Sequence, residues 1–423
     1  MELGTLEHEF RRELAGLVGT PPTEDQITRL IEYALKSGRT KDFLRVLDEQ
    51  PPAIRDLLYE RLLAQPLSRG GLQALEKHFR TAVARGRWQS ITGTISSFRD
   101  PRAYLGLVRV LALTADRQLR DALLELFDSA PPGPYGEALR RALHGNDSRL
   151  QLVAVDLMGR TDQPTLVDEL FRFYLRLDPA RDERLRLRSR EAFLSLTDRL
   201  PETEIEPRIG RWLQDERPGA RLLAIAAIQR RGLWHLIPEL VRLVLVDPKT
   251  RTQAAVALTS LEGAGLLRFD REDPLGEGVR QVLQKARREP LRRLLHQFLQ
   301  SESAVLREIG VKFLTALGPE PDDLPVLLRL AREEGVAPVR GAALRALVRY
   351  DPQAAADSLV TALTDRGVLP GSSLMLIVED ILDNELGEDL REQVLREADR
   401  LRREREQVRQ RFAGEAEAWR EPD

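Results

Sequence analysis

The sequence predicts an all-α fold, a solenoid in which pairs of helices stack side by side. A nine-residue phrase recurs along the chain as ARLLAIAAI at 220–228, TRTQAAVAL at 250–258, LREIGVKFL at 306–314 and VRGAALRAL at 339–347. A period of about 30–40 residues is typical of stacked helical arrays. Composition agrees: 42% of the residues are hydrophobic but only 5% are aromatic, which favours a core of Leu, Ala, Val and Ile without strand-like alternation.

Length and charge narrow the class of protein further. A chain of 423 residues is long for one compact core, but a solenoid avoids this limit because each repeat packs only on its neighbours. The net charge is −2. Because binding to phosphates usually requires a basic excess, nucleic acid is a disfavoured partner, although a local arginine stripe would be compatible with it.

The chain contains no cysteine, which excludes disulfides and cysteine-ligated zinc sites. It does not begin with a basic segment followed by an apolar one, and no segment approaches 18 uncharged apolar residues. We therefore expect a cytoplasmic protein that does not span a membrane.

Three regions are expected along the chain. Residues 1–145 form a helical region, with helices that start after Pro21-Pro22, after Pro51-Pro52 and after Asp100-Pro101. This region is either a degenerate continuation of the array, which we favour, or a separate cap. Residues 146–385 form the repeat array, and residues 386–423 form a charged C-terminal helix and tail.

Small residues mark six copies of the phrase, where two helix backbones have to approach each other: Ala154, Ala192, Ala224, Ala254, Gly310 and Ala343. The copy at Ala192 fits least well, because Arg188 and Ser189 occupy the positions of the usual Val-Arg pair. The interval between Ala254 and Gly310 is too short for two full repeats. It predicts one irregular unit together with a loop around 263–278.

The clearest unit, residues 215–261, predicts a first helix (helix A) followed by a second (helix B). Asp215 is expected to cap helix A, since its carboxylate can accept from free amides of the first turn. Gly232 supplies a left-handed stop to helix A. Pro238 is tolerated in the first turn of helix B, where its missing N–H has no partner in any case.

The order Asp, then Val/Ala-Arg-x-x-Ala-x-x-Ala-Leu, then Gly, then Ile-Pro-x-Leu resembles HEAT repeats of the HEAT/armadillo superhelix. More narrowly it is similar to the bacterial HEAT-like repeats that also occur in phycobilin lyases. The resemblance covers about half of the chain and implies a fold rather than an activity. Some HEAT-like solenoids are similar to DNA glycosylases that act on alkylated bases.

The C-terminal helix is dense in charge and carries an apolar stripe of Val394, Leu401, Val408 and Phe412. Val394, Leu401 and Val408 are spaced by seven residues, but the stripe is too short to establish a coiled coil. We expect this helix either to cap the last repeat or to support self-association or partner docking.

No coherent catalytic set appears in the sequence. It lacks a Gly-rich phosphate loop, a Gly-x-Ser-x-Gly elbow and a His-Glu-x-x-His motif, and no two of its five histidines have the spacing of helical metal ligands. We expect no catalytic, cofactor or metal-binding residues, although residues distant in sequence can still converge in space.

Candidate partner-binding residues lie in or near the predicted B helices, which line the concave side of HEAT arrays. They are two tryptophans and four arginines: Arg211, Trp212, Trp234, Arg242, Arg293 and Arg329. Tryptophan is a frequent anchor at interfaces, and an arginine ladder can receive acidic groups. Packing between repeats is the other role open to Trp212, and a solvated face is the other role open to the arginines.

These observations favour a non-catalytic scaffold or adaptor that binds a protein or peptide partner on the concave face of the solenoid. One alternative is a nucleic-acid-binding protein similar to HEAT-like DNA glycosylases. Another is a lyase-type protein, which only the repeat resemblance implies.

Overall fold

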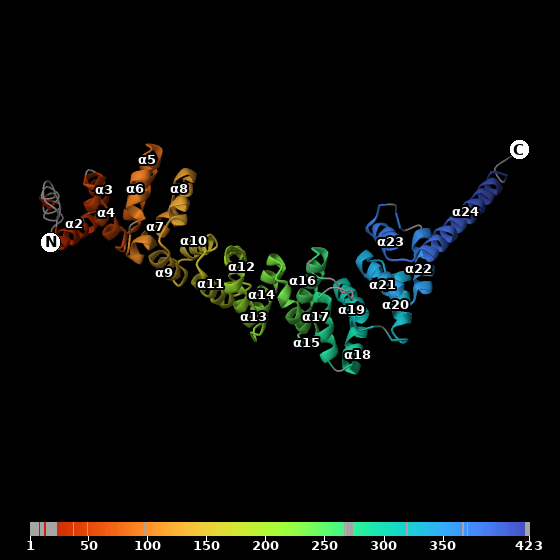
Figure 1. Cartoon of the computed structure of the whole chain (residues 1–423). Coiled ribbons are helices and arrows are strands. Elements are labelled where there is room, and N and C mark those ends of the chain that lie inside the picture. Colours follow the sequence, from red (N-terminus) through yellow and green to blue (C-terminus); the bar gives the residue numbers. More distant parts are fainter. Residues whose placement is uncertain are drawn as a thin grey trace. The chain divides into compact units, whose positions relative to one another are not determined.

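The computed structural model describes residues 23–265, 267 and 274–418, apart from residues 37, 49, 97, 287, 319, 366–367 and 370, together with residues 8, 12 and 13. Throughout these described residues the regular structure is helical (Figure 1). The chain divides into two compact units, residues 1–208 and residues 209–423. The boundaries at 145 and 385 expected from the sequence stay predictions.

Unit 1 holds the first helices of the chain. They are α2 (Glu24–Lys36), α3 (Thr40–Asp48), α4 (Pro52–Leu63), α5 (Arg69–Ala84), α6 (Trp88–Ile95), α7 (Pro101–Leu113), α8 (Arg117–Asp128), α9 (Pro132–Leu143), α10 (Ser148–Met158), α11 (Pro164–Arg176), α12 (Glu183–Arg199) and most of α13 (Glu202–Leu213).

Unit 2 begins within α13. It continues with α14 (Pro218–Arg231), the 3-10 helix η1 (Trp234–Leu236), α15 (Ile237–Val246), α16 (Arg251–Gly263), α17 (Pro274–Lys285), α18 (Arg288–Leu299), α19 (Ala304–Leu317), α20 (Leu324–Glu333), α21 (Ala337–Tyr350), α22 (Pro352–Thr364), α23 (Ser373–Asn384) and α24 (Glu388–Ala418).

Within each unit the helices alternate between two rows. In unit 2, α14 packs on α16, α19 on α21 and α21 on α23, and these are the A helices. The facing row of B helices pairs α20 with α22 and α22 with α24. In unit 1 the same alternation pairs α7 with α9 and α10 with α12. This packing confirms an all-α solenoid of stacked helix pairs.

The small residues of the repeated phrase lie where helices touch. Ala224, Ala254 and Ala343 are fully buried in α14, α16 and α21. At Gly310 of α19, an added Cβ would lie 3.1 Å from Cβ of Phe298 in α18. These positions are small because a larger side chain would push neighbouring helices apart.

The clearest unit follows the prediction at two of three points. Helix α14 ends at Gly232, whose φ of 65° is left-handed, and Pro238 lies in the first turn of α15 after the short helix η1. The prediction that Asp215 caps helix A was wrong. The N-cap of α14 is Arg217, and the Asp215 carboxylate accepts from the Arg217 backbone N–H at 2.9 Å, outside the helix.

The interval between Ala254 and Gly310 holds two helices, α17 and α18, where other pairs have a single B helix. Both pack on α19, while α16 also reaches α19 directly. The irregular unit expected here is therefore an insertion of one extra helix. The predicted loop around 263–278 falls largely outside the described residues.

One arginine recurs at the second position of the phrase and donates to backbone carbonyls in the last turn of the preceding B helix or in the turn that follows it. The four donors, with the acceptor residues in parentheses, are Arg221 (Asp215), Arg251 (Val244 and Leu245), Arg307 (Ser301 and Glu302) and Arg340 (Ala331). Carbonyls at a helix C-terminus have no partner within the helix. Arg251 and Arg340 therefore cap the helix before their own, whereas Arg221 and Arg307 satisfy carbonyls of the turn that follows it.

Three of these arginines also contact a carboxylate at the end of the following B helix. The pairs are Arg221 with Asp247 at 2.7 Å, Arg307 with Glu334 at 2.8 Å and Arg340 with Asp365 at 3.6 Å. A single guanidinium thus joins the ends of two successive B helices. We call this set of contacts the arginine bridge.

Among the described residues of unit 1, Gln151 makes the carbonyl contacts of the bridge without the carboxylate contact. Gln151 of α10 occupies the arginine position, and its Nε2 donates to the Gly145 carbonyl at 2.7 Å and to the Leu143 carbonyl at 3.3 Å, at the end of α9. In α12 the position is Ser189, whose hydroxyl donates to Leu185 of its own helix. The weak repeat match at Ala192 therefore coincides with a missing bridge.

The bridge lowers the pKa of the Glu334 carboxyl. Burial alone would raise the pKa of the Glu334 carboxyl. Hydrogen bonds from Arg307 and from the backbone N–H of Val336 outweigh burial and hold this pKa below its ordinary value. Glu334 therefore stabilises the fold in its charged form.

Replacing Gly106 with Ala tests close packing in unit 1. A Cβ at Gly106 in α7 would overlap the carbonyl oxygen of Leu63, the last residue of α4. We expect a loss of about 1–3 kcal/mol in the free energy of unfolding, measured by chemical denaturation. Gly93→Ala is the matched control: no atom lies within 4 Å of its added Cβ, so we expect a gain of up to about 1 kcal/mol.

Replacing Arg307 with Met tests the bridge in unit 2. The Arg307 and Glu334 side chains are 17% and 10% exposed, so removal of the cation strands a largely buried carboxylate. We expect a loss of about 3 kcal/mol in the free energy of unfolding. The control is Arg242→Met, because Arg242 pairs with Glu239 on the surface and contributes at most about 0.5 kcal/mol. Equal losses in the two variants would contradict the role of the bridge.

Replacing Glu334 with Gln tests its charge through pH. Because the folded-state pKa is depressed, the stabilisation is complete above the ordinary Glu pKa of about 4.3 and is lost as pH falls through the lower folded value. The stability difference between wild type and Glu334→Gln should be full at neutral pH and shrink below about pH 4. Chemical denaturation at several pH values measures it, with the exposed Glu302→Gln as control. A pH-independent difference would rule this explanation out.

Candidate functional site

The arginines predicted to face a partner are exposed on B helices of unit 2. Arg211 lies at the end of α13, Arg293 on α18 and Arg329 on α20, and none of the three makes an ion pair with a described residue. Arg242 on α15 is also exposed and pairs with Glu239 at 2.9 Å. These helices therefore carry positive charge on their solvent side.

The two predicted tryptophans differ in exposure. Trp212 is only 7% exposed, so its ring packs inside the helical layer and offers little surface to a partner in this conformation. Trp234 in η1 is 48% exposed and stacks edge-on against His235, with ring centroids 4.6 Å apart. Of the two, Trp234 is the one placed to act as an anchor.

A hollow of about 420 Å³ lies beside Arg329, between the ends of α18 and α20. Its lining includes Leu330 and Glu333 as well as Arg307 and Glu334 of the bridge. The bridge pair satisfies its own charges, so Arg329 is the cation of this hollow that remains open to an incoming group.

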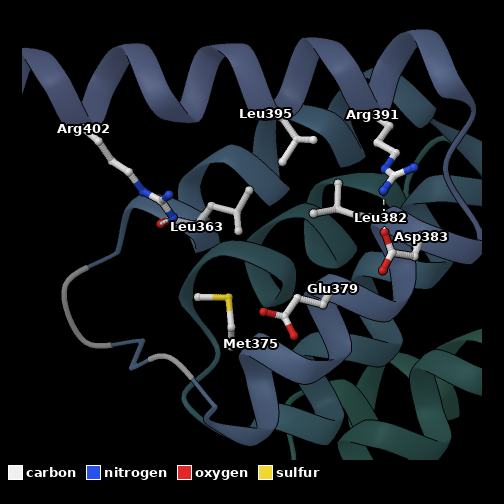
Figure 2. Close-up of a pocket in the computed structure, with 8 residues that line it drawn as sticks. All are labelled: Leu363, Met375, Glu379, Leu382, Asp383, Arg391, Leu395 and Arg402. Atoms are coloured by element: carbon white, nitrogen blue, oxygen red, sulfur yellow. Dashed lines mark hydrogen bonds and ion pairs between the residues drawn. The ribbon is translucent and has the colours of Figure 1, made fainter.

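A second hollow, of about 350 Å³, lies among α22, α23 and α24 (Figure 2). We call it the C-terminal groove. Met375 and Leu382 of α23 are largely buried at its floor, while Leu395 of α24 is 43% exposed at its side. Leu363 at the end of α22 completes the apolar lining.

The cations of the C-terminal groove are already engaged. Arg391 donates to the Asp383 carboxylate at 2.7 Å, and Arg402 donates to the Leu363 carbonyl at 3.0 Å (Figure 2). Glu379 lies on the α23 wall and makes no hydrogen bond or ion pair with any described residue. The groove thus combines an apolar floor with one acidic group that lacks a partner.

Helix α23 is held firmly against α21. Arg345 of α21 contacts both Asp380 and Glu385 at 2.6 Å, and hydrogen bonds from Asn384 and Arg345 lower the pKa of the Asp380 carboxyl. A Cβ at Gly341 of α21 would lie 2.7 Å from Cγ2 of Ile377, so the two helices approach closely. The groove wall is therefore part of the rigid array.

Helix α24 has two parts with different surroundings. Val394 and Ala398 are buried, and this part packs on α22, so the helix does cap the last repeat. From residue 402 to residue 410 every side chain is exposed, and Val408 is 51% exposed. Leu401 is half-buried between the two parts, and the side chain of Phe412 lies outside the described residues.

The C-terminal groove was not predicted from the sequence. The sequence does hold an indication of this region. Residues 367–390 carry six acidic residues and no Lys or Arg, although the chain has 65 basic residues in all. An acidic stretch beside an arginine-rich helix indicates that the two meet, but it does not reveal an open groove between them.

Neither a protein-family model nor a curated protein sequence matches this chain. Among solved structures, an engineered protein matches 89% of this chain and 98% of its own, with 14% identity and a TM-score of 0.35. The karyopherin Kap121p bound to the extreme C-terminus of the protein phosphatase Cdc14p matches with 13% identity and a TM-score of 0.33. Kap95p, in a structure with RanGDP, matches with 12% identity and a TM-score of 0.35.

The Kap121p match covers 86% of this chain and 44% of that one, and the Kap95p match covers 90% and 55%. The chain thus spans about half the length of these karyopherins. At such TM-scores the fold assignment depends on the helix packing described above. None of the described helices has the length and apolar content needed to cross a bilayer. Within the same residues, no group of three or more His, Asp or Glu side chains is placed to hold a metal ion.

Proposed function

We propose that this chain is a non-catalytic scaffold that binds a protein partner along the B helices of unit 2. The partner segment is acidic, because Arg211, Arg293 and Arg329 present guanidinium groups that no described carboxylate neutralises. This is the single observation that carries the proposal. Guanidinium groups bind carboxylates through two parallel hydrogen bonds, which provides geometric selectivity.

The arginine bridge supports this assignment of faces. Arginines at the bridge position are used inside the array, whereas those on the outer side of the B helices have no such structural partner. Trp234 adds an exposed aromatic surface on the same unit, which suits an apolar residue next to the acidic ones. Placement on the concave side of the solenoid follows the HEAT resemblance and stays a prediction.

Other parts of the assignment also stay predictions. They include the cytoplasmic location, the narrower similarity to bacterial repeats of the phycobilin-lyase type and the absence of catalysis. Nucleic acid is the competing ligand for an arginine face. It is distinguished by the steep salt dependence of phosphate contacts.

A triple charge reversal tests the proposal. Arg211, Arg293 and Arg329 are changed together to Glu, and binding of a fluorescent peptide of alternating Glu and Leu is followed by anisotropy. We expect the wild-type chain to bind the peptide and the variant to lose at least about tenfold in affinity. The matched control reverses Arg120, Arg181 and Arg190, which are exposed in unit 1, and should retain binding.

A duplex DNA of random sequence serves as the second probe in the same assay. The wild-type chain could bind DNA more tightly than the peptide, with a steep salt dependence and with loss of binding in the triple variant. That result would assign the arginine face to nucleic acid instead of a protein. Two results would contradict the proposed binding face. One is failure of the wild-type chain to bind either probe, and the other is an equal loss of affinity in the triple variant and its control.

A further inference from the structure

We propose that the chain self-associates through its C-terminus, with residues 403–411 of α24 in one copy docking antiparallel into the C-terminal groove of a second copy. A two-fold axis relates the copies, so that each copy contributes one docking segment and one groove. This inference concerns a different surface from the arginine face of the proposed function and stands independently of it.

The docking segment is helical and basic, and its residues 403–410 are exposed. It holds four arginines and two glutamates, and its apolar residue Val408 is 51% exposed. Arg405 is the member of the segment that contacts its own unit, since its guanidinium donates to the Thr364 carbonyl at the end of α22. The C-terminal part of α24 extends past the other helices of its unit (Figure 1). A second surface that covered Val408 would remove this apolar side chain from water.

The groove complements this segment in size and charge. Its volume of about 350 Å³ accommodates one or two aliphatic side chains, but not a whole helix, so Val408 can enter while the helix lies across the opening. Glu379 at the wall has no described partner, whereas Arg391 and Arg402 are both engaged (Figure 2). Asp383 pairs with Arg391 and Asp399 lies 3.7 Å from Arg402, so the charged group of the lining that is left without a described partner is Glu379, which suits an arginine of the docking segment.

The order of residues along α24 explains why the occupant is a second copy. The groove is lined by α24 from Arg391 to Arg402, a length of about 16 Å, and the docking segment follows at once over about 12 Å. Two antiparallel copies that cross near Arg402 place each docking segment beside the groove of the other. One axis thus produces two identical contacts, as in most homodimers.

Sedimentation velocity and multi-angle light scattering on the full chain test the proposal directly. We expect the wild type to populate a dimer at micromolar concentrations. Val408→Asp removes the apolar side chain that enters the groove, and Glu379→Arg removes the acidic wall. Each change should weaken the dimer by at least about tenfold.

Both positions are exposed, so the variants should keep the wild-type circular dichroism spectrum and melting temperature. Matched controls are Leu187→Asp, at a residue that is 60% exposed in unit 1, and Glu216→Arg, at an exposed acidic residue outside the groove. These controls should leave the dimer unchanged.

A mixing experiment separates docking from a general loss of fold. A Val408→Asp chain retains an intact groove, and a Glu379→Arg chain retains an intact docking segment. Their mixture can form a heterodimer with one intact contact of the two, so it should associate more tightly than either variant alone.

Three outcomes of the association experiments would overturn the proposal, and a peptide-binding outcome would do so as well. The first is a wild-type chain that is monomeric throughout this concentration range. The second is a dimer that neither variant weakens, and the third is a mixture no tighter than its components. Binding of a separate basic peptide to a monomeric chain, lost in Glu379→Arg, would assign the groove to a different partner and equally refute docking of a second copy.

Discussion

The arrangement of unit 2 depends on an arginine that joins the ends of successive B helices. The last carbonyls of a helix cannot be satisfied within it, and burying them against a neighbouring repeat would be costly. A guanidinium offers five donors in a planar fork, enough to reach backbone carbonyls of one helix end and a carboxylate of the next. Arg340 does both, with Ala331 in the last turn of α20 on one side and Asp365 after α22 on the other. A lysine ammonium lacks this geometry, which explains an arginine at the three positions that also contact a carboxylate.

The last repeat shows what happens where the bridge is absent. Helix α23 has no arginine, so the carbonyls at the end of α22 are free of the usual donor. Arg402 and Arg405 of α24 supply it, since they donate to Leu363 and Thr364. The same contacts anchor α24 along the C-terminal groove. The contacts that end the array therefore also form the C-terminal groove. The surfaces proposed for binding lie where no buried carbonyl needs a further hydrogen-bond donor.

Much of the fold was predictable, because local chemistry and repeat packing agree. The small residues of the phrase and the stop at Gly232 follow from sterics that sequence alone reveals. The bridge was harder to foresee, because its acceptors are backbone carbonyls and its acids differ in type. Its sequence signal is an acidic residue 25–27 positions after the arginine, as in Arg221 with Asp247. Burial of Trp212 and the groove at α24 depend on tertiary contacts between separate helices, which periodicity does not encode.

A double-mutant cycle on Arg221 and Asp247 tests the bridge most directly. The two side chains are 13% and 15% exposed and lie 2.7 Å apart. Unfolding free energies are measured for wild type, Arg221→Met, Asp247→Asn and the double variant. A bridge that holds neighbouring pairs together predicts a coupling energy of about 1–3 kcal/mol between the two changes. Additive changes, with a coupling indistinguishable from zero, would show that the helices stack without it.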